Sequence, residues 1–111
     1  MATLDELLNI NGVVAAGEWT ADGTLVNYKA KMDMPPEMAA MMAQYCATLT
    51  MTFNALAGAF SKLSPMSWVP QQGWAYSGGD WTVAIGGNRG VFVETAKADF
   101  NQLFQALVGS R

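Results

Sequence analysis

The sequence predicts an α/β fold of the α+β type, with helices and strands in the order αββαβββα. We expect a five-stranded antiparallel sheet, with a long middle helix on one face and the two terminal helices on the other. Three observations support this fold: an apolar hairpin pattern near the N-terminus, a long helical-period stripe in the middle, and three short apolar runs between glycine-rich turns. A length of 111 residues fits a single domain spanning residues 1–111.

The first element is a short amphipathic helix over residues 3–9. Thr3 followed by Glu6 forms a capping box, and the acidic side chains favour the positive end of the helix dipole. The leucines at positions 4, 7 and 8 share one face, and Asn11-Gly12 ends the helix.

Residues 13–19 and 24–31 are predicted to be two strands. Asp22-Gly23 between them is typical of a tight hairpin turn with positive φ angles. Gly17 and the alanines of the first strand leave one face nearly flat, so we expect a helix to approach closely there.

The long helix begins after Asp33-Met34-Pro35-Pro36-Glu37, because prolines are tolerated in a first turn, and ends at Ser64-Pro65. Large side chains recur at spacings of three and four, which predicts a helical stripe of about seven turns. That stripe consists of Met38, Met42, Tyr45, Leu49, Phe53, Leu56, Phe60 and Leu63.

Residues 67–77, 81–86 and 90–95 are predicted to be three strands of a meander, with turns at 78–80 and 86–90. Pro70 cannot donate to a ladder, which places its strand at an edge or a bulge. A last helix over residues 99–108 is capped by Asp99 and ended by Gly109. We expect its inward side chains to be Phe100, Leu103, Phe104 and Leu107.

The composition excludes several classes of function. The net charge is −3 and the six basic residues are scattered, so the chain lacks the basic stripe that nucleic-acid binding needs. The absence of His and the single cysteine, Cys46, argue against an enzyme, a metal centre, a cofactor and a disulfide. A lone cysteine fits the reducing cytoplasm, and the N-terminus has no basic segment typical of a signal peptide.

Residues 38–61 carry no charged side chain and are long enough to span a bilayer. Gln44, Thr48 and Asn54 interrupt this run, which also lies between two predicted hairpins. We therefore expect no membrane span.

Glycine, acidic, methionine and aromatic clusters were considered as sites. The segment 86–90 (GGNRG) precedes a strand, so a hairpin turn is favoured over a phosphate loop. The acids fall at turns and helix starts, where capping explains them. The methionines suit a core or an adaptable protein interface better than a Cu(I) site. Four aromatic residues indicate either packing against a helix or a small-molecule pocket, namely Trp68, Trp74, Tyr76 and Trp81.

The first hairpin, the helix over 38–63 and the closing hairpin (WTVAIGGNRGVFVET) together resemble the Roadblock/dynein-light-chain family, whose fold is profilin-like. More narrowly, the chain is similar to an uncharacterised prokaryotic branch of that group. The resemblance implies homodimers whose sheets join edge to edge and whose middle helices pack together. It also implies non-catalytic regulators or scaffolds for small GTPases or motor complexes, with no catalytic motif to carry over.

Charged residues make up only 14% of the chain, against about 25% in typical domains, which favours a surface covered by a partner. We expect the large face of the helix (Leu49, Phe53, Leu56, Phe60) to cover its own sheet. We expect the flatter flank to form a homodimer interface through Met41, Ala47, Thr48, Met51 and Ala55. The sequence thus predicts a non-catalytic homodimeric regulatory or scaffolding module, whose further partner is a small GTPase or another protein. The alternative is a small-molecule sensor that uses the aromatic pocket.

Overall fold

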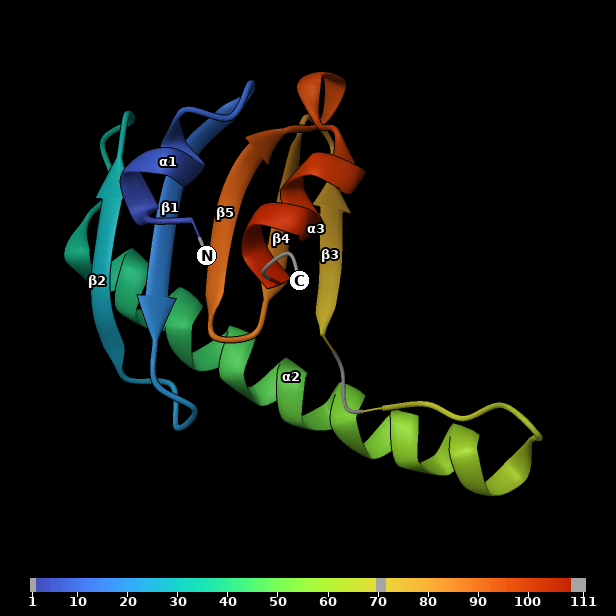
Figure 1. Cartoon of the computed structure of the whole chain (residues 1–111). Coiled ribbons are helices and arrows are strands. Elements are labelled where there is room, and N and C mark those ends of the chain that lie inside the picture. The colour runs from blue at the N-terminus through green and yellow to red at the C-terminus, as the bar shows by residue number, and fades with distance from the viewer. Residues whose placement is uncertain (1, 70–71, 109–111) are drawn as a thin grey trace.

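The computed structural model describes residues 2–69 and 72–108, which form a three-layer sandwich (Figure 1). Helices and strands follow one another in the predicted order αββαβββα, and a turn of 3-10 helix at Thr95–Lys97 precedes the last helix. The elements are α1 (Leu4–Leu8), β1 (Val13–Trp19), β2 (Leu25–Ala30), α2 (Pro36–Leu63), β3 (Gly73–Gly78), β4 (Trp81–Gly86), β5 (Arg89–Glu94) and α3 (Phe100–Val108).

In the described residues the strands form one five-stranded sheet in the order β2-β1-β5-β4-β3, with every neighbouring pair antiparallel. Helices α1 and α3 cover one face, and α2 crosses the other (Figure 1). This arrangement confirms the predicted fold. Strand β3 lies at an edge, but it starts at Gly73, so the prediction of a strand from residue 67 was wrong. Pro70 lies outside the described residues.

Several local predictions hold in detail. The Thr3 hydroxyl accepts from the Glu6 amide at 3.1 Å, and the Glu6 carboxylate accepts from the Thr3 amide at 2.8 Å, which completes the capping box. The Asp99 carboxylate accepts from the Gln102 amide at 3.2 Å at the start of α3.

The first hairpin turn is longer than the Asp-Gly pair predicted. The Thr20 amide donates to the Thr24 carbonyl at 2.9 Å, which closes a loop over residues 20–24. Within it Gly23 has a φ of 90°, whereas Asp22 does not have a positive φ. A Cβ atom at Gly23 would lie 3.1 Å from the Gln44 Cα, so this loop also packs directly on α2.

The core has two parts, one on each face of the sheet. Beneath α1 and α3, Leu7, Val93 and Leu103 are fully buried together with Leu107. Phe100 was predicted to point inward, but it is exposed because it starts the helix at the rim of this layer.

On the other face, α2 packs against the sheet through its small side chains. Ala43, Cys46 and Ala47 cluster with Trp19 and Ile85. The buried residues of this helix are Ala39, Ala43, Cys46, Ala47 and Ala57. Small side chains let the helix backbone approach the flat face of β1, as the glycine and alanines of that strand indicated. Leu49, Phe53, Leu56 and Phe60 were predicted to cover the sheet. The prediction was wrong for Leu49, Leu56 and Phe60, which are exposed, whereas half-buried Phe53 packs on Trp74 of β3.

Candidate interaction surface

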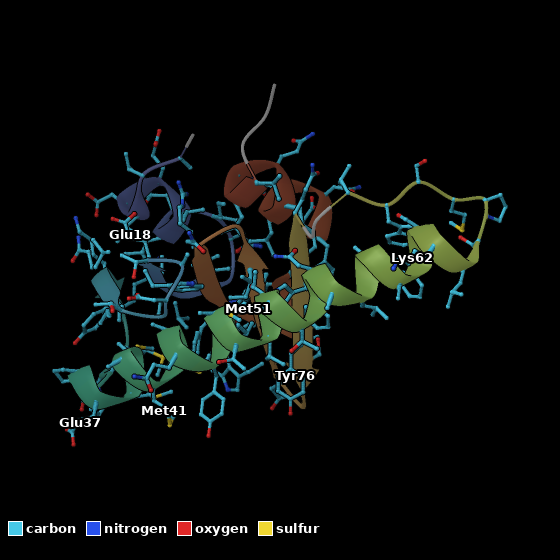
Figure 2. All side chains as sticks on the ribbon, turned by 90° about the horizontal axis from the view of Figure 1, so that it is seen from below. Glu18, Glu37, Met41, Met51, Lys62 and Tyr76 are labelled. Atoms are coloured by element: carbon cyan, nitrogen blue, oxygen red, sulfur yellow. The ribbon has the colours of Figure 1, made fainter. Side chains whose placement is uncertain are left out.

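The exposed apolar side chains concentrate on α2 and the segment that follows it. Figure 2 shows this helix along the outside of the molecule, with Met41 pointing away from the sheet. Leu63 is 87% exposed and Met51 66% exposed. Large apolar surface left in contact with water on a small domain is typical of a binding surface. The exposed apolar residues of this region are Met41, Tyr45, Leu49, Met51, Leu56, Phe60, Leu63, Met66, Trp68 and Val69.

The C-terminal part of α2 extends past the edge of the sheet (Figure 1). With 28 residues the helix is about 42 Å long at about 1.5 Å per residue. The sheet is only about 20 Å wide, because neighbouring strands lie about 4.8 Å apart. Residues 58–63 are all exposed, as are most of residues 64–69. We call residues 58–69 the terminal arm.

Hydrogen bonds and a ring contact hold the terminal arm in one shape. The Ser61 hydroxyl accepts from the Trp68 amide at 2.8 Å and donates to the Trp68 carbonyl at 3.1 Å. The rings of Phe60 and Trp68 lie 5.0 Å apart. The Ser64 hydroxyl donates to the Phe60 carbonyl at 2.7 Å and ends the helix. The segment after α2 therefore folds back along the helix as an ordered unit.

A groove of about 440 Å³ lies where the arm leaves the sheet, beside the start of β3. Its walls include Phe53, Leu56 and Phe60 from the helix, Trp68 from the arm and Trp74 from β3. We call it the edge groove.

A second concave site lies at the other end of β3, on the same face of the sheet. Tyr76, Val83 and Phe92 are direct neighbours across three strands, and Trp81 comes two positions before Val83. With Met32, Met38 and Gly78 these residues line a hollow of about 380 Å³. We call it the aromatic hollow. Its lining has no charged side chain, and Tyr76 is 67% exposed.

The structure does not bring the four predicted pocket residues together. Trp68 and Trp74 line the edge groove, whereas Tyr76 and Trp81 line the aromatic hollow. The division has two physical causes. Trp68 precedes β3 and packs on Phe60. The Trp74 indole donates to the Thr50 hydroxyl at 3.1 Å, which holds this ring against α2.

The five residues predicted to form the homodimer interface do not all lie on the surface. Met41, Thr48, Met51 and Ala55 are exposed, whereas Ala47 is 6% exposed and packs against its own sheet. The other flank of α2 is richer in large side chains. Met42, Leu49 and Leu56 follow one another at intervals of seven residues, so they share this flank. Met38 lines the aromatic hollow and Leu56 the edge groove, which shows that this flank runs on the side of β4 and β3.

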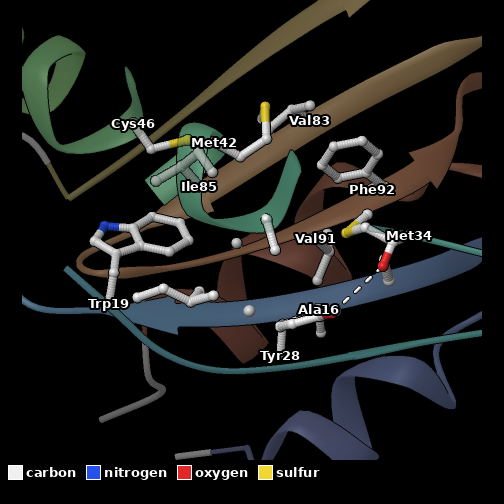
Figure 3. Close-up of a pocket in the computed structure, with 15 residues that line it drawn as sticks. Ala16, Trp19, Tyr28, Met34, Met42, Cys46, Val83, Ile85, Val91 and Phe92 are labelled. Atoms are coloured by element: carbon white, nitrogen blue, oxygen red, sulfur yellow. Dashed lines mark hydrogen bonds between the residues drawn. The ribbon is translucent and has the colours of Figure 1, made fainter. Parts of the chain in front are cut away.

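A small apolar cavity of about 40 Å³ lies under the first half of α2 (Figure 3). Trp19, Met42, Cys46 and Ile85 contribute to its walls, and Tyr28 donates to the Met34 carbonyl at 3.3 Å beside it. Burial raises the pKa of the Cys46 thiol from 9.0 to about 11. The thiol is thus a neutral part of the core rather than a nucleophile.

Residues 2–69 and 72–108 contain no group of three or more His, Cys, Asp or Glu side chains placed to hold a metal ion. Within those same residues, no helix is both long and apolar enough to cross a bilayer.

The element order, the sheet and the single long helix on one face define a Roadblock fold. Gliding protein MglB from Thermus thermophilus matches with a TM-score of 0.73 at 16% identity, covering 95% of this chain and 82% of that chain. A Roadblock/LC7 domain from Streptomyces avermitilis matches with a TM-score of 0.76 at 13% identity, covering 94% and 84%. MglB from Myxococcus xanthus matches with a TM-score of 0.73 at 10% identity, covering 92% and 79%. At these identities the likeness concerns the fold.

Within that class, the model of an uncharacterised conserved protein family, DUF2173, matches residues 3–108. The chain belongs to this family. A comparison with curated proteins gives no match.

Proposed function

We propose that this protein is a non-catalytic regulatory or scaffolding module that works as a homodimer and acts on a small GTPase or a larger complex. The observation that carries the proposal is the row of large apolar side chains on α2 next to the open edge of β3. An apolar helix face and a free strand edge side by side offer both side-chain burial and backbone hydrogen bonds to a second copy.

Antiparallel pairing of two β3 strands joins the two sheets into one. Strand β3 has a neighbour on one side, β4, among the described residues, so its other edge has backbone groups available for pairing. A two-fold axis through the middle of β3 satisfies the symmetry of a homodimer. It places both copies of α2 on the same face of the joined sheet.

The flank of α2 that carries Tyr45, Leu49 and Leu56 then faces the second helix. This flank runs on the β3 side, where the partner would lie, whereas Met51 and Ala55 lie on the other side of the helix. The sequence-based choice of the flank with Met41, Thr48, Met51 and Ala55 is a competing arrangement, which a pair of matched variants separates below.

A regulatory role is supported by the resemblance to Roadblock proteins and by the chemistry of the chain. The lack of histidine and the burial of Cys46 leave few groups for nucleophilic or metal-based catalysis. The reduced, buried cysteine fits a cytoplasmic location. In a dimer the outer side of α2, including Met41 and Met51, stays available for a further protein partner.

The sensor alternative has less support. Its four aromatic residues lie in two separate depressions, and the small cavity near Cys46, at about 40 Å³, has too little room for a metabolite. Native mass spectrometry of freshly purified protein tests it. A retained small molecule would favour the sensor, and a bare dimer favours the scaffold.

Affinity capture from native lysate tests the regulatory part. Wild-type protein and the Met51→Glu and Val26→Glu variants would serve as baits, since Met51 lies on the outer side of α2 and Val26 on the distant strand β2. We expect a GTP-binding protein or a defined complex on the wild type and on Val26→Glu, and less of it on Met51→Glu. Equal recovery on all three baits, or none on wild type, would contradict the assignment.

A further inference from the structure

We infer that the terminal arm of one subunit closes the aromatic hollow of the other subunit. The inference rests on the proposed homodimer and adds which parts of the two chains meet. It begins from an incomplete packing: in the single chain, the arm exposes Leu63 and Met66, and the hollow exposes Tyr76 and Trp81.

The length of α2 gives the first argument. Two sheets joined through β3 contain ten strands and span about 43 Å, close to the helix length of about 42 Å. The part of α2 before residue 58 packs on its own sheet through small side chains up to Ala57. The part beyond Ala57 passes the β3 edge and therefore lies over the sheet of the partner (Figure 1).

The direction of β3 gives the second argument. The arm leaves its own sheet beside the start of β3, because the edge groove includes Gly73 and Trp74. A two-fold axis pairs the start of one β3 with the end of the other. The partner's arm consequently arrives at the end of β3, at Tyr76 and Gly78, which are the walls of the aromatic hollow.

The chemistry of the two surfaces matches. The hollow has aromatic and thioether walls without a charged side chain, and the arm presents Phe60, Leu63 and Met66. Aliphatic and thioether side chains pack well on aromatic faces. Since the partner helix enters across β3, its last residues reach farthest over the sheet. Leu63 of one chain should therefore lie near Met32 of the other, on the far wall of the hollow.

Cysteine cross-linking tests this contact in the full-length protein. Leu63 and Met32 are both exposed, so Leu63→Cys and Met32→Cys leave the fold intact, and buried Cys46 does not compete for the reagent. With a short bismaleimide, we expect the double variant to give a covalent dimer and each single variant to give none. The control is Leu63→Cys with Val26→Cys. Val26 is also exposed, but it lies near the start of β2, whereas Met32 follows the end of that strand.

A Leu63–Met32 double variant that stays uncross-linked, while light scattering shows a dimer, would overturn the inference and leave the proposed function standing. Equal cross-linking in the Val26 control would overturn it too, because the reaction would then report collision. A monomer by light scattering is a separate result, and it would remove the proposed homodimer itself.

Discussion

The indole Nε1 of Trp74 lies 3.1 Å from the hydroxyl oxygen of Thr50, and this hydrogen bond joins the edge strand β3 to the middle of α2. The rings of Phe53 and Trp74 meet edge to face at 5.4 Å beside it. The pair fixes where α2 crosses the edge and hence where the terminal arm begins. It also separates the edge groove from the aromatic hollow.

Thr50→Val should destabilise the protein by about 1–3 kcal/mol, because the partly buried indole N–H loses its acceptor. Chemical denaturation followed by circular dichroism measures the change. Thr52→Val is the matched control, since its hydroxyl donates only to the Thr48 carbonyl of the same exposed helix. We expect the control to stay within about 0.5 kcal/mol of wild type. Equal losses in the two variants would contradict the role of the Trp74 bond.

Two glycine-to-alanine changes should have opposite effects. Gly23→Ala forces a residue with a side chain to adopt a φ of 90° and brings its Cβ to 3.1 Å from Gln44, so we expect a loss of at least about 1–2 kcal/mol. Gly58→Ala lies in the exposed helix with nothing within 4 Å of its Cβ, so we expect a gain of about 0.5–1 kcal/mol. Thermal and urea unfolding measure both. A stabilised Gly23→Ala variant would show that the loop does not pack on α2.

The thiol of Cys46 should resist modification in the folded protein. Its pKa is raised to about 11 by burial, so the unfolded chain releases the proton at a lower pH than the folded chain. This group's contribution to stability is full below pH 9.0, declines as pH rises above that value, and is lost through pH 11. Comparing unfolding of wild type and Cys46→Ala between about pH 8 and 10.5 isolates this contribution. Fast thiol labelling of the native protein at about pH 8 would contradict it.

Glutamate substitutions on the two flanks of α2 show which flank forms the homodimer interface. Leu49→Glu should weaken the homodimer by more than about tenfold, because it buries a carboxylate against the second helix. Met51→Glu, two positions away, should leave the dimer intact because Met51 lies on the outer side. Sedimentation equilibrium gives both dissociation constants. The reverse order of effects would restore the flank with Met41, Thr48, Met51 and Ala55 as the interface.

The element order followed from the sequence because its signals are local. Thr3 and Glu6 cap a helix wherever that helix packs, and the alternation in residues 81–86 defines a strand without reference to its neighbours. The orientation of α2 is not a local property. A stripe that includes Leu49, Leu56 and Phe60 looks like a core face when the partner surface is unknown. Here the close approach of Ala43 and Ala47 to the sheet is the more stable packing, which leaves the larger side chains for another surface.

The candidate sites were harder to predict for the same reason. Trp74 and Tyr76 lie two positions apart on β3 and share one face of it, but the sequence does not show that Thr50 of α2 binds Trp74 and that the two rings line different sites. The terminal arm was missed because residues 67–69 look like the start of a strand. Ser61, which binds both backbone groups of Trp68, is a common polar residue with no distinctive spacing.

The proposed helix interface and the contact of the terminal arm both require that two chains associate. Light scattering coupled to size-exclusion chromatography measures this association at micromolar concentration. We expect wild-type protein to elute with twice the 11.9 kDa mass of the chain. A mass of 11.9 kDa across that concentration range would contradict the homodimer.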